Sequence, residues 1–219
     1  PDYPDGRYFL DTRVLARWEL RVNGERIERL AVSRPEPVVA VVVGRVRPAP
    51  GESYADVVVF RHRHVGPGMR ERLVFRNYGV EPAPVIIELF CDVDFADLFE
   101  VKGSRLRSVG FPVHQSESRA LRFWNKRGHV RKDVTVRLSE PAHIEPGMVT
   151  WRHTLPPRQD LEVCIEVAVS LDQSEIGSRF RCGADDESSV PSRRLASWQA
   201  KFPSIDTDSA DLREVIGRV

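Results

Sequence analysis

The densest acidic group in the sequence is a short stretch that carries four carboxylates, Asp92, Asp94, Asp97 and Glu100. Hydrolysis of a glycosidic bond needs two carboxyl groups about 5 to 9.5 Å apart, one to donate a proton and one to act as base or nucleophile. This stretch has enough carboxylates to supply such a pair. The same residues would also suit a polar turn that caps a strand and is anchored by arginines, so the spacing alone leaves both interpretations open.

Two histidines have the spacing of metal ligands on a strand. His62 and His64 lie two positions apart, so both imidazoles would point to the same side and could chelate a metal. No third ligand follows at a short spacing, and Arg61 and Arg63 would repel a cation. We therefore expect no metal site.

Aromatic residues form the next candidate set, because flat rings can stack on the C–H faces of sugars. Tyr8 and Trp151 lie beside expected turns and are the candidates for exposure and sugar stacking, whereas Trp18 and Trp124 lie within alternating strands and are expected in the core. The sequence has no P-loop, no G-x-G-x-x-G fingerprint and no G-x-S-x-G elbow. No cofactor is expected.

The element that must position the first of these residues is a strand near the N-terminus. Apolar side chains occupy every second position from Val14 to Val22, which is the period of a half-buried strand. Asn23 and Gly24 follow and suit a two-residue hairpin turn. Pairing about this turn sets Leu20 opposite Ile27, Arg21 opposite Arg26 and Glu19 opposite Glu28. The two like-charged pairs are unfavourable, and the diagonals Glu19–Arg26 and Arg21–Glu28 partly compensate.

Most of the remaining chain also has the pattern of strands. They are expected at residues 26–32, 38–43, 54–64, 69–77, 85–93, 119–125, 133–138, 148–153 and 161–171. The apolar run 38–43 suggests a strand covered on both faces, and the alternation in 85–93 breaks down at Phe90 and Cys91. About ten strands at short, regular spacing predict an antiparallel sandwich or barrel.

The end of the chain changes character. Residues 184–189 are acidic and polar, and residues 191–202 and 209–219 show helical spacing, with Asp208 as a plausible N-cap of the second helix. We therefore expect a β domain over residues 1–183, followed by a linker and helical segment over residues 184–219. Because the chain begins at Pro1 and its last helical pattern reaches Val219, we expect a fragment of a longer protein.

Composition excludes some classes of partner. The 33 basic and 32 acidic residues give a net charge of +1, which argues against nucleic-acid binding. Three widely spaced cysteines without a C-x-x-C pair argue against a disulfide framework and a structural zinc site. No apolar run approaches the roughly 20 residues of a membrane span, and no signal peptide is evident. A cytoplasmic location without membrane attachment is expected.

Residues 7–24 contain an Asp11-Thr12-Arg13 triplet, then the strand and the Asn-Gly turn. This run resembles the opening motif of the N-terminal domain of bacterial glycogen-debranching-type glycosidases, the amylo-alpha-1,6-glucosidase family. Residues 94–103 are similar to the family's second hallmark, with Lys102 where arginine is more usual, and residues 61–77 fit between the two. Two motifs in the expected order are more specific than either alone.

The resemblance implies an all-β fold, an antiparallel β supersandwich of the galactose-mutarotase-like kind with a short C-terminal helical segment. It also implies a partner in the same polypeptide, an (α/α) toroid that carries the catalytic acids and is absent here. The polar-turn interpretation of the carboxylates is therefore favoured, and the chain is expected to be non-catalytic, to pack on that partner and to help shape an α-glucan site.

Two other functions stay open. One is a stand-alone carbohydrate-binding module. The other is an enzyme of the mutarotase or epimerase kind, since supersandwich folds can host a histidine and a glutamate as acid and base. Its candidates are His114, His129, His143 and His153 with Glu140, Glu145 and Glu166. Nothing in their spacing demands that they meet.

The two polar motifs lead to one structural hypothesis. If the chain is extended at Asp11 and Arg13, both side chains project from the same face. A short helical turn would bring Asp97 near Glu100. We expect Arg13 to bind one of these two carboxylates, and the polar edge formed by Asp11, Thr12, Arg13, Asp94, Asp97 and Glu100 to dock the helical domain rather than bind sugar.

Overall fold

The chain folds into two compact units, residues 1–183 and residues 184–219. The computed structural model describes residues 6–36, 38–47, 56–66, 68–103, 113–127, 129–171, 174–176, 180–184, 190–201, 207–209 and 212. Its strands are β1 (Arg7–Phe9), β2 (Thr12–Leu15), β3 (Arg17–Val22), β4 (Glu25–Arg26), β5 (Glu28–Glu36), β6 (Val39–Arg45), β7 (Val57–Val65), β8 (Met69–Asn77), β9 (Ala83–Asp92), β10 (Val113–Glu117), β11 (Ala120–Arg127), β12 (Val130–Leu138), β13 (His143–Glu145), β14 (Met148–Leu155), β15 (Asp160–Leu171) and β16 (Ser174–Ile176). Its helices are α1 (Leu98–Lys102) and α2 (Val190–Gln199).

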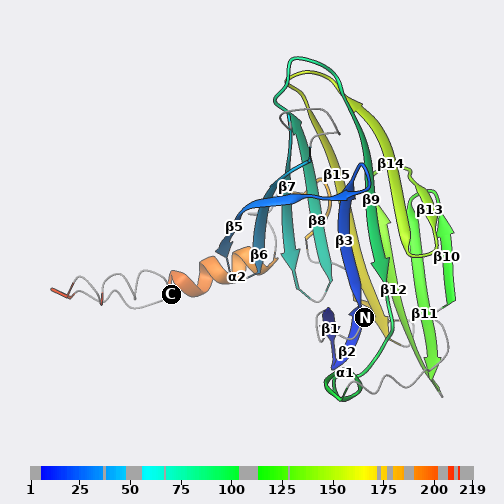
Figure 1. Cartoon of the computed structure of the whole chain (residues 1–219). Helices are drawn as coiled ribbons and strands as arrows, with labels where there is room; N and C mark the ends of the chain where they lie inside the picture. Colours follow the sequence, from blue (N-terminus) through cyan, green and yellow to red (C-terminus); the bar gives the residue numbers. More distant parts are fainter. Residues whose placement is uncertain are drawn as a thin grey trace. The chain divides into compact units, whose positions relative to one another are not determined.

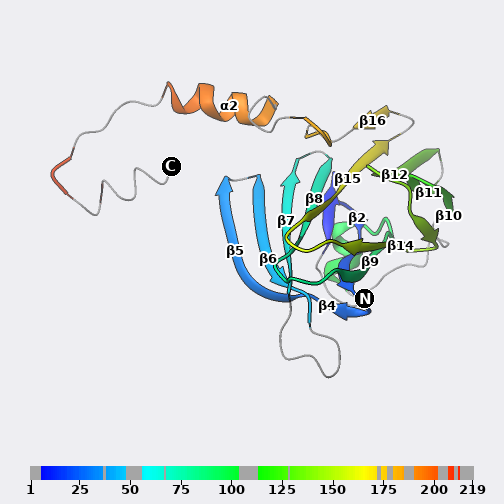
Figure 2. The same cartoon turned by 90° about the horizontal axis from the view of Figure 1, so that it is seen from above.

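The first unit consists of two facing antiparallel sheets and a small two-stranded ribbon, β1–β2. The larger sheet has the strand order β10-β11-β12-β15-β8-β7-β6-β5, with β16 paired to β15, and the smaller has the order β13-β14-β9-β3-β4. Figure 1 shows the sheets from the side, and Figure 2 shows the larger sheet as an arc with β9 and β14 on its concave side. The predicted all-β antiparallel sandwich with a short C-terminal helical segment is confirmed.

The core lies between the sheets and comes from the alternating positions of their strands. Leu20 and Val22 on β3 are buried, as the spacing of that strand predicts. Leu73 and Phe75 on β8 and the inward row of β15 meet them from the other sheet. Since successive side chains of a strand point to opposite faces, one apolar row per strand is enough to build this layer.

The Asn23–Gly24 hairpin forms, but it is shorter than predicted. Both residues have positive φ, 53° and 80°, as this turn requires. Arg21 pairs with Arg26 in the expected register, and Arg26 reaches diagonally to Glu19 at 3.1 Å. The expected pairs Leu20–Ile27 and Glu19–Glu28 do not form, because β4 ends at Arg26 and the chain then crosses to the larger sheet as β5.

The prediction that the apolar run 38–43 is covered on both faces is wrong. Its residues are only partly buried, because β6 lies second from the edge of the larger sheet and β5 is exposed along most of its length. β5 has two register irregularities and contains Pro35. Bulges and prolines are the usual means by which an edge strand avoids pairing with another chain.

Of two other strands, one has the predicted bounds and the other differs in detail from the sequence pattern. β8 has the predicted bounds, whereas the alternation of β9 continues through its end instead of breaking down. Cys91 is buried, and Phe90 takes an outward position under Arg17 and Arg21, whose guanidinium carbons lie 4.3 and 5.2 Å from the ring centre. The short strands β10, β13 and β16 were not predicted.

The second unit contains α2, which falls within the predicted helix 191–202 apart from its first residue. The predicted linker 184–189, apart from Ala184, and most of the predicted second helix lie outside the described residues. Among the described residues of that stretch, the Leu212 amide donates to Ser209 Oγ at 3.4 Å. Of the described helices, none is long and apolar enough to cross a membrane.

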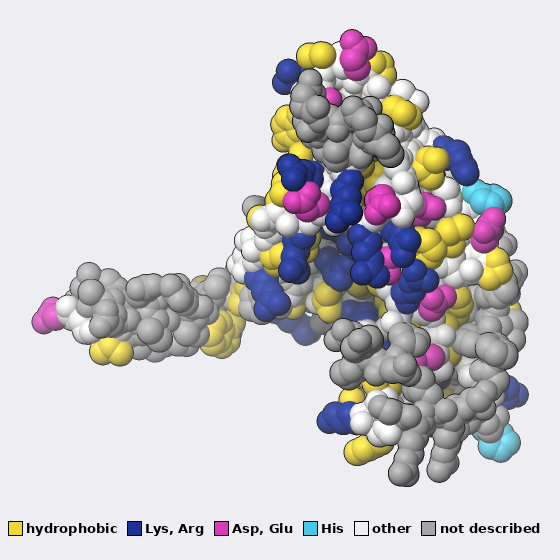
Figure 3. All heavy atoms as spheres, in the orientation of Figure 1, with side chains coloured by type: hydrophobic (Ala, Val, Ile, Leu, Met, Phe, Trp, Pro, Cys, Tyr) yellow, Lys and Arg dark blue, Asp and Glu magenta, His cyan; other side chains and the backbone are white. Residues whose placement is uncertain are grey.

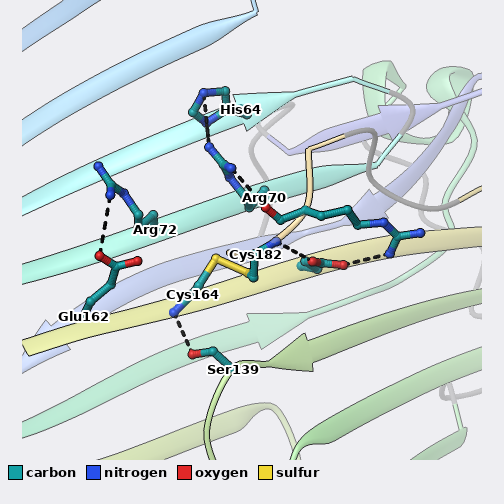
Figure 4. Close-up of a disulfide and its surroundings, with 9 residues drawn as sticks. His64, Arg70, Arg72, Ser139, Glu162, Cys164 and Cys182 are labelled. Carbon is teal, nitrogen blue, oxygen red and sulfur yellow. Dashed lines mark hydrogen bonds and ion pairs between the residues drawn. A yellow bond between two sulfur atoms is a disulfide. The ribbon is translucent and has the colours of Figure 1, made fainter. Parts of the chain in front are cut away.

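A disulfide joins Cys164 on β15 to Cys182 near the end of the first unit (Figure 4), with 5.8 Å between the Cα atoms. The expectation that the chain has no disulfide framework is therefore wrong for these two cysteines. The sequence separation is 18 positions, and only the return of the chain along β15 brings the two residues together. Disulfides are rare in reducing compartments, so the cysteines no longer support a cytoplasmic location. That location stays a prediction.

The segment that carries Cys182 is held by further contacts. Phe180 is buried and its ring lies 4.6 Å from that of His64, while Arg70 donates to the Arg181 carbonyl at 3.2 Å. The Cys182 amide and the Arg181 guanidinium donate to the two carboxylate oxygens of Glu166, at 2.7 and 2.9 Å. The end of the first unit is thus fixed to the outer side of the larger sheet.

Candidate functional site

The two polar motifs come together at one end of the sandwich, where Figure 1 shows α1 beside β1 and β2. Thr12 forms an isolated antiparallel bridge with Asp97. The Arg13 amide donates to the Ala96 carbonyl at 2.7 Å, and the Leu98 amide donates to the Asp11 carbonyl at 2.8 Å. Backbone hydrogen bonds therefore join residues 11–13 to residues 96–98. We call this region the motif edge: residues 10–13 together with residues 94–102.

The chain is not extended at Asp11, so the condition under which Asp11 and Arg13 would share a face is not met. Leu10 and Asp11 both have positive φ, 43° and 57°, so the chain turns between β1 and β2 instead of running extended. Asp11 is exposed, whereas Arg13 is buried. The extended geometry that the prediction assumed starts only at Thr12.

Arg13 binds Asp94, not the predicted Asp97 or Glu100. Its side chain is 1% exposed, its Nε donates to Asp94 Oδ2 at 3.0 Å, and its Nη2 also donates to that carboxylate. This hydrogen bonding raises the pKa of Arg13 further. Asp94 also accepts from the Ala96 amide at 3.2 Å, which fixes the carboxylate against the start of the second motif.

Asp97 and Glu100 cap the first turn of α1. Asp97 caps α1, since its Oδ1 accepts from the amides of Phe99 and Glu100, both at 2.8 Å. Glu100 Oε2 in turn accepts from the Asp97 amide at 3.0 Å, which completes a capping box. The predicted helical proximity of the two residues is confirmed, and their engagement with backbone amides explains why Arg13 has a different partner.

Thr12, the remaining member of the triplet, links the motif edge to the larger sheet. It is buried, and its hydroxyl accepts from the Lys132 ammonium on β12. Asp92, the fourth carboxylate of the acidic stretch, lies apart from this network, and burial raises its pKa. The acidic stretch has the contacts of a polar turn that caps a strand and a helix.

The two candidates for sugar stacking, Tyr8 and Trp151, differ in burial. Trp151 is 3% exposed and lies in the core, so its assignment as a sugar-stacking residue is wrong. It lies on β14, whose pairing with β9 directs its ring inward among the alternating core residues. Tyr8 is partly buried on β1. Trp18, which was expected in the core, is partly buried and packs against the core, and its indole N–H donates to Glu71.

Glu71 is the centre of a buried charge cluster that the sequence patterns did not predict. Its side chain is fully buried on β8, and it accepts from Arg61 Nε at 2.8 Å and from Arg63 Nη2 at 3.1 Å. Burial alone would raise the pKa of Glu71, but the two arginines and the Trp18 hydrogen bond outweigh it and lower the pKa to about 2. A glutamate at an inward position, between Met69 and Leu73, was the signal available in the sequence.

His64 binds an arginine of the neighbouring strand β8. His64 is buried and accepts from Arg70 at 2.9 Å, and the described part of the chain contains no group of three or more His, Cys, Asp or Glu that could hold a metal ion. Of the proposed acid–base pairs, His153 meets Glu140 at 3.0 Å. His143 binds its near neighbour Glu145 at 3.1 Å, and the side chain of His114 lies outside the described residues.

Solved structures resemble this fold at low sequence identity. A putative kojibiose phosphorylase from the human microbiome superposes with a TM-score of 0.54 at 10% identity, over 88% of this chain and 26% of that one. A polysaccharide lyase gives a TM-score of 0.36 at 14% identity, over 70% of this chain and 25% of that one. The first likeness supports the fold alone, and the second is too distant to support a conclusion. This chain spans about a quarter of the length of both.

Family models give a direct assignment. No curated protein matches the sequence. The model of the N-terminal domain of some glycogen debranching enzymes matches residues 1–166, which is most of the first unit and includes both polar motifs. The chain therefore belongs to the family of N-terminal domains of glycogen debranching enzymes.

Proposed function

We infer that this chain is the non-catalytic N-terminal β domain of a glycogen-debranching-type glycoside hydrolase. In this proposal the motif edge docks a helical (α/α) catalytic domain of the same polypeptide and helps shape its α-glucan site. The observation that carries the docking role is the exposure of two large apolar side chains at this edge, Leu10 at 69% and Phe99 at 81%.

The two apolar side chains lie on a hydrogen-bonded part of the backbone. Leu10 lies in the β1–β2 turn, next to the backbone hydrogen bonds that tie this turn to α1. Phe99 lies in the first turn of α1, and its amide is held by the Asp97 cap. Protein interfaces depend on a few apolar or aromatic anchors surrounded by polar groups, and anchors on a rigid base lose little conformational entropy on binding.

The contacts of the acidic stretch support a non-catalytic role. Asp94 binds Arg13, and Asp97 and Glu100 bind backbone amides, so these carboxylates have structural partners. We expect the isolated chain to release no reducing sugar from glycogen, pullulan or maltotriose. Turnover that disappears in Glu100→Gln would overturn this expectation.

The proposal places a helical domain in the same polypeptide, and the docking role is tested with that domain produced separately. The 219-residue chain should bind it, and Phe99→Ala should weaken the affinity at least tenfold, about 1.4 kcal/mol, which is the scale of an interface anchor. Val80→Ala is the matched control, since Val80 is 73% exposed in the turn between β8 and β9. Equal affinities of the two variants, or a coding sequence without a helical domain, would contradict the proposal.

A carbohydrate-binding module is distinguished by a measurement on the chain alone. The proposal expects no saturable binding of maltooligosaccharides by the isolated 219-residue chain in isothermal titration calorimetry. Binding at this stage, without the helical domain, would favour the independent module. The mutarotase alternative predicts faster mutarotation of a free sugar in polarimetry, lost in Glu140→Gln, because Glu140 is the partner of His153.

A further inference from the structure

A small buried patch lies on the outer face of the larger sheet, apart from the core between the two sheets. The outer face of an antiparallel sheet that packs on one side is expected to be exposed. Four outward-pointing residues of β7, β8 and β15 are instead only 1% to 5% exposed: His64, Arg70, Cys164 and Ala168. Of the described arginines in this unit, only Arg13 and Arg70 are buried, whereas Lys and Arg side chains gather at the surface over the middle of the unit in Figure 3.

The patch is covered by the end of the first unit, residues 180–183, which we call the strap. Phe180 is 2% exposed and lies outside the main core cluster. Its ring centre lies 4.6 Å from that of His64 and 5.9 Å from the guanidinium carbon of Arg70. Arg70 also donates to the Arg181 carbonyl at 3.2 Å. The strap therefore lies directly over a histidine and an arginine of the sheet.

The Cys164–Cys182 disulfide joins the strap covalently to β15, and Figure 4 shows it beside Arg70. The other contacts of the strap are hydrogen bonds and the packing of one ring. Glu166 accepts from the Cys182 amide at 2.7 Å, and the Arg181 side chain that also binds it is 55% exposed. Such contacts contribute an amount comparable to the conformational entropy lost when a short segment is fixed. Segments at the end of a domain also open more easily than core strands, so the covalent bond decides whether the strap stays closed.

We propose that this disulfide is a redox latch: the strap covers His64 and Arg70 while Cys164 and Cys182 are oxidised, and it leaves them when both are reduced. The reductant is an external dithiol. Its thiolate attacks the sulfur of Cys182, the more exposed cysteine, the S–S bond breaks, and Cys164 leaves as a thiolate that takes up a proton. The second thiol of the reductant then displaces Cys182. The reductant ends as a disulfide, and the protein gains two electrons and two protons as two thiols.

Release of the strap changes two properties of the β unit. The buried side chains of His64 and Arg70 become accessible from solvent. The last anchored point of the unit also moves, because the described element before the strap is β16, which pairs with β15, and the second unit begins at Ala184. Reduction therefore shifts this point from Cys182 back to β16. The latch is separate from the docking role of the motif edge and does not depend on it.

Limited proteolysis of the 219-residue chain tests the latch. Subtilisin is suitable because it has no disulfide and tolerates the reductant, and mass spectrometry identifies cleavage after Phe180 in native buffer with and without dithiothreitol. Phe180 must leave His64 before a protease can bind it, so we expect cleavage there to be at least tenfold faster in the reduced chain. Phe75 on β8 is 0% exposed and is the internal control. Cleavage after Phe75 should stay slow in both states, because the sheet keeps its fold.

A variant and a second readout complete the test. The double variant Cys164→Ala and Cys182→Ala should be cut after Phe180 at the fast rate with and without dithiothreitol. The second readout needs no variant: modification of His64 by diethyl pyrocarbonate should be at least tenfold faster after reduction. His143, whose side chain is 63% exposed, should react equally in both states.

Three results would overturn the proposal. The first is equal cleavage after Phe180 in the oxidised and reduced chains. The second is cleavage after Phe75 that rises as much as cleavage after Phe180, which would show that reduction unfolds the whole unit. The third is a His64 that stays protected from diethyl pyrocarbonate in the reduced chain.

Discussion

Arg13 lies buried against Asp94, although 81 positions separate them in the sequence. One residue belongs to the first polar motif and the other begins the second. The ion pair, together with the backbone hydrogen bonds around it, makes the β1–β2 turn and α1 a single rigid edge. The exposed Leu10 and Phe99 lie on this edge.

Removal of Asp94 should strongly destabilise the β unit. Asp94→Ala leaves the guanidinium of Arg13 buried without this carboxylate, and breaking a buried pair in this way typically costs about 3 to 5 kcal/mol of unfolding free energy. Urea denaturation followed by circular dichroism measures the loss. The full double-mutant cycle with Arg13→Ala should give a coupling well above about 1 kcal/mol, the upper end for exposed pairs.

The matched control is a bidentate pair at the surface. Arg76 and Asp160 bind at 2.6 Å with side chains 46% and 38% exposed, so the same cycle there should give about 0 to 1 kcal/mol. Equal coupling in the two cycles would show that burial of Arg13 adds nothing to its pair.

Gly6→Ala should disturb the packing around the Arg13 side chain. Gly6 has φ of 146°, and a Cβ there would lie 2.6 Å from Arg13 Cδ and 2.7 Å from the Leu15 carbonyl. Backbone strain and this clash together should cost about 1 to 3 kcal/mol. Gly24→Ala separates the two effects, since Gly24 also has positive φ but no atom lies within 4 Å of the position that a Cβ would take there. A loss in Gly6→Ala no larger than in Gly24→Ala would exclude the clash.

Glu71 should make stability depend on acid pH. Its pKa falls from 4.5 to about 2 in the folded state, so its contribution is fully present above pH 4.5 and is lost as the pH falls toward 2. The size expected from this shift is about 3 kcal/mol. The measurement is urea unfolding across this pH range for the wild type and Glu71→Gln. The difference between them should shrink as the pH falls; a constant difference would mean that Glu71 is not the titrating group.

Reduction of the Cys164–Cys182 disulfide should lower stability by about 3 kcal/mol, the value for a closed loop of this length. Unfolding with and without dithiothreitol measures the effect. The double variant Cys164→Ala and Cys182→Ala should have the lower stability already and no response to the reductant. A response in that variant would point to Cys91 or to a direct effect of the reagent.

Local patterns in the sequence were enough for most of the elements and for some of their ends. Strand alternation depends only on the two-residue period of a pleated chain, so the bounds of β8 and the core row of β15 followed from it. The Asn23–Gly24 turn and the helical proximity of Asp97 to Glu100 are short-range signals, because each needs only residues within a few positions. The family resemblance came from motifs of the same local kind.

Tertiary structure decided which distant residues meet. The pairing of Arg13 with Asp94, the burial of Trp151 and the disulfide between Cys164 and Cys182 all depend on the order and register of strands in two sheets. A strand's sequence shows which side chains share a face, but it does not show which strand lies opposite or which face is covered. For that physical reason the partner of Arg13, and with it the geometry of the motif edge, could be read only from the folded chain.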